Sequence, residues 1–218
     1  MKQLALLFIL VSALTFSTNA QNEINGEITD EMFKSMPEPI YTSMTDEICD
    51  SIKDLDMNMP MDELGKKFSA AVNQAYKSHA EKIDIFRQLY IQQKKLNANE
   101  VNTMIGKALN KKLAPKCDNF VMINYKSLVS KQSTVTTPYF EKISKELCDK
   151  LKKNKNKSYS ELMTLINSNK LSIAQKYEEG IKADYPSGIM DNNFNKELNS
   201  YLMENCYLYY KVFFINLQ

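Results

Sequence analysis

A fifteen-residue segment of the first half of the chain returns in the second half, and this repeat constrains the fold more than any other feature. The two segments, Pro39–Lys53 and Pro138–Lys152, align without a gap. The identical pairs are Pro39/Pro138, Glu47/Glu146, Cys49/Cys148, Asp50/Asp149 and Lys53/Lys152. Two unrelated segments of this length would share roughly one identity, so the repeat indicates an internal duplication.

A closing signature repeats as well. Leu109-Asn110-x-x-Leu113-x-x-x-Cys117 returns as Leu198-Asn199-x-x-Leu202-x-x-x-Cys206. A middle segment with a Glu-Leu pair lies between the opening and closing segments in both copies. Each copy therefore has an opening segment with one cysteine, a middle segment, and a closing segment with a second cysteine.

These boundaries predict the domain organisation. Ser130–Thr137 is rich in Ser and Thr and has no apolar period, as is typical of a linker. We predict a signal peptide over 1–20, a flexible leader over 21–38, a helical module over 39–129, a linker over 130–137 and a second helical module over 138–218.

The first residues have the pattern of an export signal. Lys2 precedes a short apolar run, Leu4–Phe16, and Thr18-Asn19-Ala20 offers small residues for cleavage. A transmembrane helix needs about 20 apolar residues, so a retained membrane anchor is the less favoured alternative. The pattern predicts a secreted or periplasmic protein without stable membrane insertion after cleavage.

Four cysteines in an exported chain are typical of a disulfide framework, although four cysteines allow three pairings. If each module folds as a unit, the pairs are Cys49–Cys117 and Cys148–Cys206. Each bond would then stabilise its module by about 4 kcal/mol through chain entropy. The cysteine spacing does not match a zinc site. A catalytic thiol needs a histidine partner, and the chain has a single histidine, His79.

Apolar residues recur at helical spacing throughout both modules. We expect opening helices from Pro39 and Pro138, the second capped by Thr137, and an uninterrupted middle helix through Leu64 and Tyr90. Ser158-x-x-Glu161 predicts a capping box at the second middle helix. Closing helices are expected over 99–129, with a kink or restart near Lys112 because of Pro115, and over 191–217. The fold class is therefore all-α: a tandem duplication of a disulfide-stapled three-helix unit.

Two groups of side chains form a candidate binding surface, consisting of Lys150, Lys152, Lys153, Lys155 and Lys157 with Tyr207, Tyr210 and Phe214. A lysine run can bind an anionic polymer or head group, but it is also typical of a solvated helix end. The aromatic residues of the last helix can form a partner surface or be buried.

His79 and the repeated Glu/Asp pairs have structural interpretations. His79 lies on the apolar face of its helix and aligns with Tyr177, which favours a hydrogen-bonded core residue over a general base. Glu47/Asp50 and Glu146/Asp149 occur at i,i+3 in both modules, which favours capping or salt bridges over paired catalytic carboxylates.

No phosphate loop, nucleophile elbow, metal-spaced cluster or catalytic triad occurs in the sequence. From this we predict an exported, non-catalytic helical interaction protein that is not an enzyme and needs no cofactor or metal. The expected partner is a protein or a small apolar ligand and not nucleic acid, because the net charge is only +2. The alternative is a carrier that holds a lipid-like ligand between its helices, and an enzyme without a recognisable motif comes third.

Overall fold

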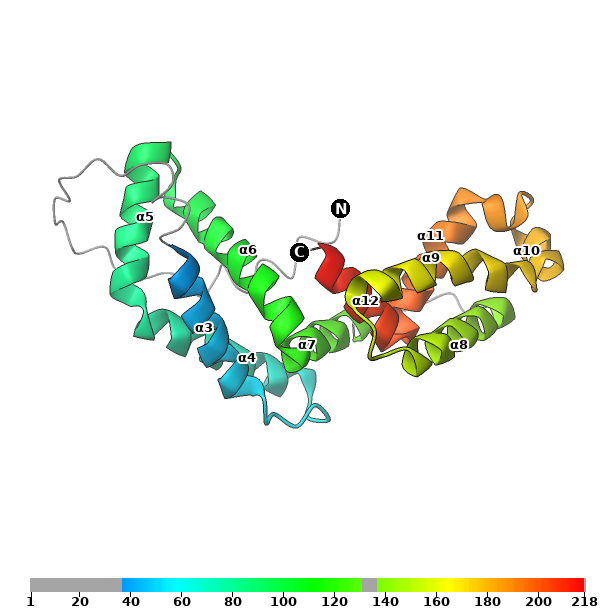
Figure 1. The fold of residues 1–218 in the computed structure, drawn as a ribbon, viewed down its shortest axis with the longest axis horizontal. Coiled ribbons are helices and arrows are strands. Elements are labelled where there is room, and N and C mark those ends of the chain that lie inside the picture. The colour runs from blue at the N-terminus through cyan, green and yellow to red at the C-terminus, as the bar shows by residue number, and fades with distance from the viewer. Residues whose placement is uncertain (1–36, 131–136, 218) are drawn as a thin grey trace. The chain divides into compact units, whose positions relative to one another are not determined.

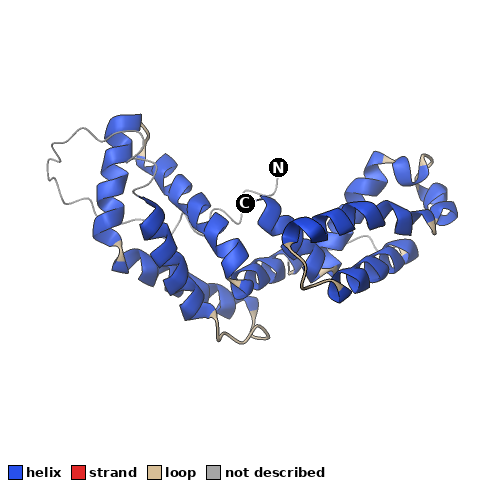
Figure 2. Ribbon diagram, viewed as in Figure 1, coloured by secondary structure: helices blue, strands red, loops and turns tan. Residues whose placement is uncertain are grey.

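The computed structural model describes residues 37–130 and 137–217 of the 218-residue chain. Within these residues the regular structure is helical throughout (Figure 2). The predicted all-α fold class is confirmed. In the described part of the chain, no helix is both long and apolar enough to cross a membrane.

The helices follow one another with short connections. They are α3 (Pro37–Ile52), α4 (Met61–Ser78), α5 (Ala80–Lys94), α6 (Ala98–Lys116), α7 (Asp118–Val129), α8 (Pro138–Lys153), α9 (Tyr159–Gln175), α10 (Glu178–Asp184), the 3-10 turn η1 (Gly188–Met190), α11 (Asn192–Asn205) and α12 (Tyr207–Leu217). The chain divides into two compact units, one ending at Phe120 and the other beginning at Val121, so the boundary lies within α7. Figure 1 labels the helices along the chain. The predicted module boundary at 130–137 stays a prediction, since residues 131–136 are not described.

Each unit is built around its opening helix. In the first unit, α3 packs against α4 and α6, with Met44, Ile48 and Ile52 almost fully buried. In the second, α8 packs against α9, α11 and α12. Its buried stripe is Phe140, Ile143, Leu147 and Leu151. Because these apolar residues recur every three or four positions, their side chains lie on one face of the helix. Burial of that face makes the main favourable contribution to the folding free energy of each unit.

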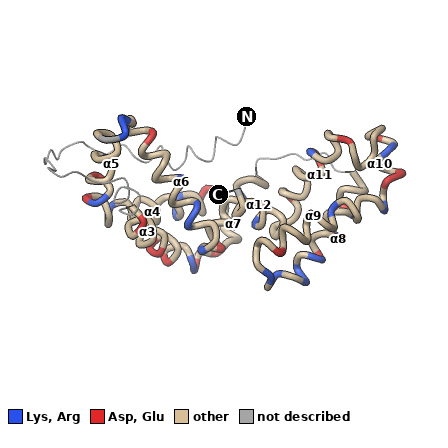
Figure 3. Tube along the Cα trace, turned by 45° about the horizontal axis from the view of Figure 1, so that its top comes forward, with Lys and Arg blue, Asp and Glu red and all other residues tan. Residues whose placement is uncertain are grey.

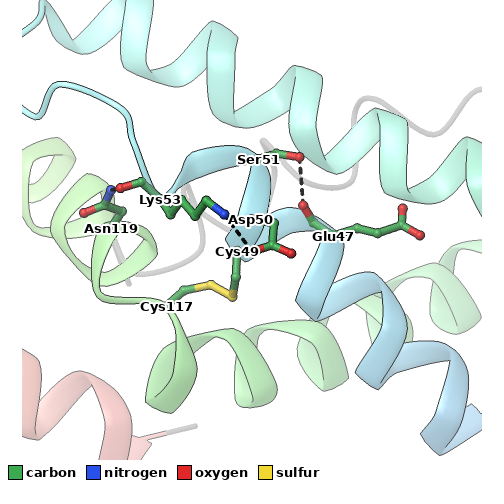
Figure 4. Close-up of polar contacts among 7 residues, drawn as sticks. All are labelled: Glu47, Cys49, Asp50, Ser51, Lys53, Cys117 and Asn119. Carbon is green, nitrogen blue, oxygen red and sulfur yellow. Dashed lines mark hydrogen bonds and ion pairs between the residues drawn. A yellow bond between two sulfur atoms is a disulfide. The ribbon is translucent and has the colours of Figure 1, made fainter.

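A disulfide joins the opening helix of each unit to its closing segment. Cys49 of α3 bonds to Cys117 and Cys148 of α8 bonds to Cys206, with Cα atoms 5.5 and 5.9 Å apart. These are the two pairs that the duplication predicts, and the Cα distances lie within the range that disulfides require. Figure 4 shows Cys49 reaching from α3 to Cys117 where α6 ends.

The predicted closing helices are each two helices, and the break falls on the bonded cysteine. Cys117 separates α6 from α7, and Cys206 separates α11 from α12. Both have extended backbone, with φ/ψ of −111°/98° and −136°/95°. The expected kink or restart near Lys112 lies instead at Cys117: Pro115 is in the last turn of α6, the helix ends at Lys116, and α7 begins at Asp118. No proline lies near the second break at Cys206, so proline does not account for it.

Asn119, just after the first break, holds the end of α3. Its side-chain amide donates to the carbonyls of Ile52 and Lys53, both at 2.8 Å. Figure 4 shows Asn119 beside Lys53. The last carbonyls of a helix have no partner within the helix, so this side chain completes the C-terminus of α3. The break therefore positions a polar side chain as well as a cysteine.

The predicted uninterrupted middle helix is also broken. His79 separates α4 from α5 with φ/ψ of −114°/12°, and Tyr177 precedes α10 with φ/ψ of −116°/15°. The apolar period continues across both breaks, which is why the sequence pattern did not reveal them. The similar backbone at corresponding positions is compatible with the predicted duplication.

Both break residues hydrogen-bond to the repeated glutamate of the opening helix. His79 Nε2 lies 2.9 Å from Glu47 Oε1, and the Tyr177 hydroxyl donates to Glu146 Oε1 at 2.6 Å. Lys176 makes a further ion pair with Glu146. His79 and the repeated glutamates are thus placed in a structural contact between the opening helix and the broken middle segment.

Local capping follows the predicted signals. Thr137 caps α8 by accepting from the Phe140 N–H, and Ser158 forms the predicted capping box with Glu161. Asn97 and Glu100 form a further capping box at the start of α6, which we did not predict. The predicted signal peptide and most of the predicted leader lie outside the described residues, and α3 begins at Pro37.

The disulfide pairing has a direct chemical test. Cleavage within the predicted linker Ser130–Thr137 should release two fragments without reduction, because each bond closes within one unit. Mass analysis of the non-reduced digest checks this, with a reduced digest as control. A single disulfide-linked species that separates only on reduction would contradict the pairing.

The Glu146 contact predicts a pH-dependent contribution to stability. Hydrogen bonds from Lys176 and then Tyr177 lower the pKa of the Glu146 carboxyl. A carboxyl with a lowered folded-state pKa stabilises the fold above its unfolded value of about 4.3 and loses this effect as pH falls through the folded pKa. Glu146→Gln should therefore lower the urea midpoint at neutral pH and have a smaller effect at strongly acidic pH.

The matched control is Glu141→Gln, an exposed carboxyl on the same helix. It should leave the urea midpoint nearly unchanged at both pH values, because surface charges of this kind contribute little. An equal loss for Glu146→Gln at neutral and acidic pH would show that the charge of Glu146 is not what stabilises the contact.

Candidate functional site

The predicted lysine run lies where α8 ends and the chain turns toward α9. Figure 3 shows basic segments at this end of α8. All five lysines are exposed; they are Lys150, Lys152, Lys153, Lys155 and Lys157. Lysine at a helix C-terminus also interacts favourably with the helix dipole, so the same residues stabilise α8.

Some of these lysines have protein partners. Lys150 donates to Asn169 of α9 at 2.5 Å, and Lys152 lies 3.9 Å from Asp149 one turn earlier. Lys153 and Lys155 make no ion pair with any residue that the structure describes. The end of α8 therefore presents positive charge that the described protein does not neutralise.

The aromatic members of the predicted surface differ in exposure. Tyr210 is only 5% exposed, because Tyr125 and Phe214 pack on it with ring centroids 5.3 and 5.4 Å away. Tyr210 is therefore buried, which is the alternative that the aromatic pattern of the last helix left open. Tyr207 and Phe214 are half-buried and keep part of their rings accessible.

A groove in the second unit brings part of the predicted surface together. Its volume is about 530 Å³. One wall is a face of α8 that includes Ser144, Lys145 and Lys152, and the other is formed where α11 meets α12, with Asn205 and Tyr207. Lys152 and Tyr207 thus meet in one site. The other four lysines and Phe214 do not line the groove.

The disulfide of the second unit lies in this groove, since Cys148 and Cys206 are both among its lining residues. The bond fixes α8 against the break between α11 and α12, and the break directs Tyr207 toward the groove. Tyr125 of α7 completes the aromatic side, and its hydroxyl donates to the Glu204 carbonyl at 2.7 Å. Burial raises the pKa of the Tyr125 hydroxyl, so this residue is a neutral donor at physiological pH.

Sequence reasoning missed Ser144, Lys145 and Tyr125. The i, i+4 spacing of Glu141, Lys145 and Asp149 could have identified a polar face of α8, but only the tertiary structure places α11 and α12 beside it. The charges on this face alternate in sign. The groove can therefore hold an anionic group at its lysines and a planar group at its tyrosines.

Lys170 is a second residue that sequence reasoning did not single out. It donates to Asn199 of the closing signature at 2.8 Å, and burial lowers the pKa of its ammonium group. The Tyr209 hydroxyl donates to the same amide oxygen at 3.0 Å. This cluster joins α9 to α11 and α12.

Among residues 37–130 and 137–217, no three His, Cys, Asp or Glu side chains lie close enough to hold a metal ion.

Comparison with known proteins gives one positive finding. The family model of the UvrD/REP helicase N-terminal domain matches residues 5–191. No curated protein and no solved structure matches the chain.

This match contradicts three of the functional predictions. A helicase family is an enzyme family, so the prediction of a protein that is not an enzyme was wrong. The same finding overturns the non-catalytic interaction protein, together with its alternative, the carrier of an apolar ligand. The prediction that nucleic acid is not a partner was wrong too, because helicases act on nucleic acid.

The matched region includes α3 to α10 and reaches the start of the closing segment of the second unit. It spans well over half of the 218 residues. The chain belongs to the UvrD/REP helicase N-terminal domain family.

Proposed function

We propose that the chain has a helicase-related function and contacts nucleic acid directly. The family match over residues 5–191 is the observation that carries this proposal. It supports a nucleic acid strand as the class of partner and strand separation as the class of process.

The end of α8 is the surface that best fits a phosphate backbone. Nucleic acid affinity comes largely from lysine and arginine side chains that replace counterions at phosphates. Lys153 and Lys155 are exposed and have no described carboxylate partner, and Lys157 follows in the same turn. This surface needs no rearrangement of the fold to become accessible.

A nucleoside triphosphate, the energy source of helicases, does not fit the residues described. A phosphate loop has the form Gly-x-x-x-x-Gly-Lys-Ser/Thr between a strand and a helix. The two Gly-Lys pairs of the chain, Gly65-Lys66 and Gly106-Lys107, lie inside α4 and α6. A Cβ at either glycine would meet nothing within 4 Å, so packing of the described protein does not require glycine at either position. We derive no step through this group.

The proposal predicts salt-dependent binding of nucleic acid to the purified chain. A fluorescent oligonucleotide should gain anisotropy on titration, with binding about tenfold weaker at roughly 200 mM than at roughly 50 mM salt. Strand separation of a labelled partial duplex is measured in parallel, with and without ATP. The double variant Lys153→Glu/Lys155→Glu should weaken oligonucleotide binding by about a further tenfold, because two phosphate contacts become repulsive.

Lys66→Glu/Lys67→Glu is the matched control, since these lysines are also exposed neighbours but lie on α4 of the first unit. It should bind the oligonucleotide nearly as the wild type does. Failure of the wild type to bind any single-stranded or duplex oligonucleotide at low salt would refute the proposed function. Equal binding by both double variants would exclude the end of α8 as the contact surface.

Export is a separate proposal, supported by the apolar run Leu4–Phe16, the small residues before Gln21 and the paired cysteines. Expression of the full chain in its source should yield a mature N-terminus at Gln21. Mass spectrometry of the intact protein from extracellular or periplasmic fractions checks this. A chain that retains Met1 and occurs only inside the cell would show that residues 1–20 are not a cleaved signal.

A further inference from the structure

The connection between α8 and α9 contains a modification motif that the proposed function does not use. Asn156-Lys157-Ser158 is the one Asn-x-Ser/Thr triplet in the 218-residue sequence. In an exported protein this triplet is the acceptor for an N-linked glycan. It lies between Lys153, the last residue of α8, and Tyr159, the first residue of α9, and is therefore inside neither helix.

The fold leaves the side chain of Asn156 accessible. Asn156 is exposed, as are Lys155 and Lys157 on either side of it. It makes no hydrogen bond with any residue that the structure describes, whereas the nearby Asn154 donates its side-chain amide to the Lys150 carbonyl at 2.9 Å. A glycan is bulky and needs a surface position, and here it displaces no described contact.

Ser158 belongs both to this motif and to the capping box of α9. Its hydroxyl donates to the Glu161 carboxylate at 2.7 Å and accepts from the Glu161 N–H at 3.3 Å. The same hydroxyl is the third element of the acceptor triplet. Because the capping box occupies the hydroxyl once α9 has folded, a glycan has to be transferred earlier, while the chain is still being exported.

The corresponding connection of the first unit, between α3 and α4, lacks both the motif and the lysines. Its triplet is Asn58-Met59-Pro60, which has no hydroxyl at the third position. Continuing the alignment of the opening segments places Asp54 and Asp56 opposite Lys153 and Lys155. The acceptor triplet and the positive surface therefore occur together in the second unit.

We propose that Asn156 receives an N-linked glycan during export and that this glycan covers the lysine run at the end of α8. In the transfer, the Asn156 side-chain nitrogen bonds to the anomeric carbon of an oligosaccharide carried on a lipid pyrophosphate. The bond from that carbon to the pyrophosphate oxygen breaks, the lipid pyrophosphate leaves with the electron pair, and the amide gives one proton to a base of the transferase. The first part of this inference rests on the proposed export, and the second part rests on the proposed function.

A glycan on Asn156 would keep a nucleic acid strand away from the lysines. Lys155 and Lys157 flank the attachment site, and Lys153 lies three residues before it. Lysine side chains have to come close to the phosphates in order to replace their counterions. The oligosaccharide leaves the lysine charges in place and occupies the space that the strand needs.

The modification is tested on the full chain purified from its source. Mass spectrometry of a digest should find carbohydrate on the peptide that contains Asn156. Asn156→Gln removes the acceptor, and Ser158→Asp removes the hydroxyl while keeping a side chain that caps α9, so both should abolish the modification. Ser158→Thr keeps the motif and the cap and should retain it. Thermal unfolding by circular dichroism confirms that each variant is folded.

The covering of the lysine run is tested by oligonucleotide binding. Asn156→Gln from the same source should bind a fluorescent oligonucleotide about tenfold more tightly than the modified wild type, because its lysines are accessible to the strand. Produced in a host that lacks the transferase, wild type and Asn156→Gln should bind equally. This control separates the effect of the glycan from that of the substitution.

The outcomes distinguish this inference from the proposals on which it rests. An exported chain with its N-terminus at Gln21 but no carbohydrate on Asn156 would overturn the inference, while the proposed export stands. A wild type that is not exported would overturn both. Equal binding by the modified wild type and Asn156→Gln would overturn the covering of the lysine run alone. If unmodified chain binds no oligonucleotide, the proposed function is wrong, and the second part of the inference with it.

Discussion

The disulfide between the opening helix and the break in the closing segment is the constraint on which each unit depends. It joins two segments that are 68 residues apart in the first unit and 58 in the second. Because the bonded closing cysteine is also the residue where the helix breaks, the bond fixes the direction in which the next helix departs. In the second unit this determines where Tyr207 lies, and hence the shape of the groove.

The two units use similar frameworks with different polar partners. The repeated glutamate contacts His79 in one unit and Tyr177 in the other, and both contacts tie the opening helix to a break in the middle segment. The closing segments differ more, since the Asp46–Lys116 ion pair of the first unit has no equivalent among the described residues of the second. Asp46, which forms an ion pair in the first unit, thus corresponds to the exposed cation Lys145 in the second.

The functional predictions went wrong because they were drawn from missing motifs. Phosphate loops, triads and metal sites are short local patterns, whereas the family resemblance extends over residues 5–191. The small net charge led in the same way to the wrong prediction that nucleic acid is not a partner. A sum over the chain does not reveal that lysines gather at one end of α8, where local positive potential, and not total charge, attracts an anionic strand.

The amino-acid sequence alone determined the helical class, the buried stripes of α3 and α8, the caps at Thr137 and Ser158 and, through the repeat, the cysteine pairs. These follow from local spacing and from comparison of the chain with itself. Only the tertiary structure decided where the middle and closing helices break and which polar face of α8 stays open. The physical reason is that apolar periodicity runs on through a break, and exposure of a side chain depends on segments distant in sequence.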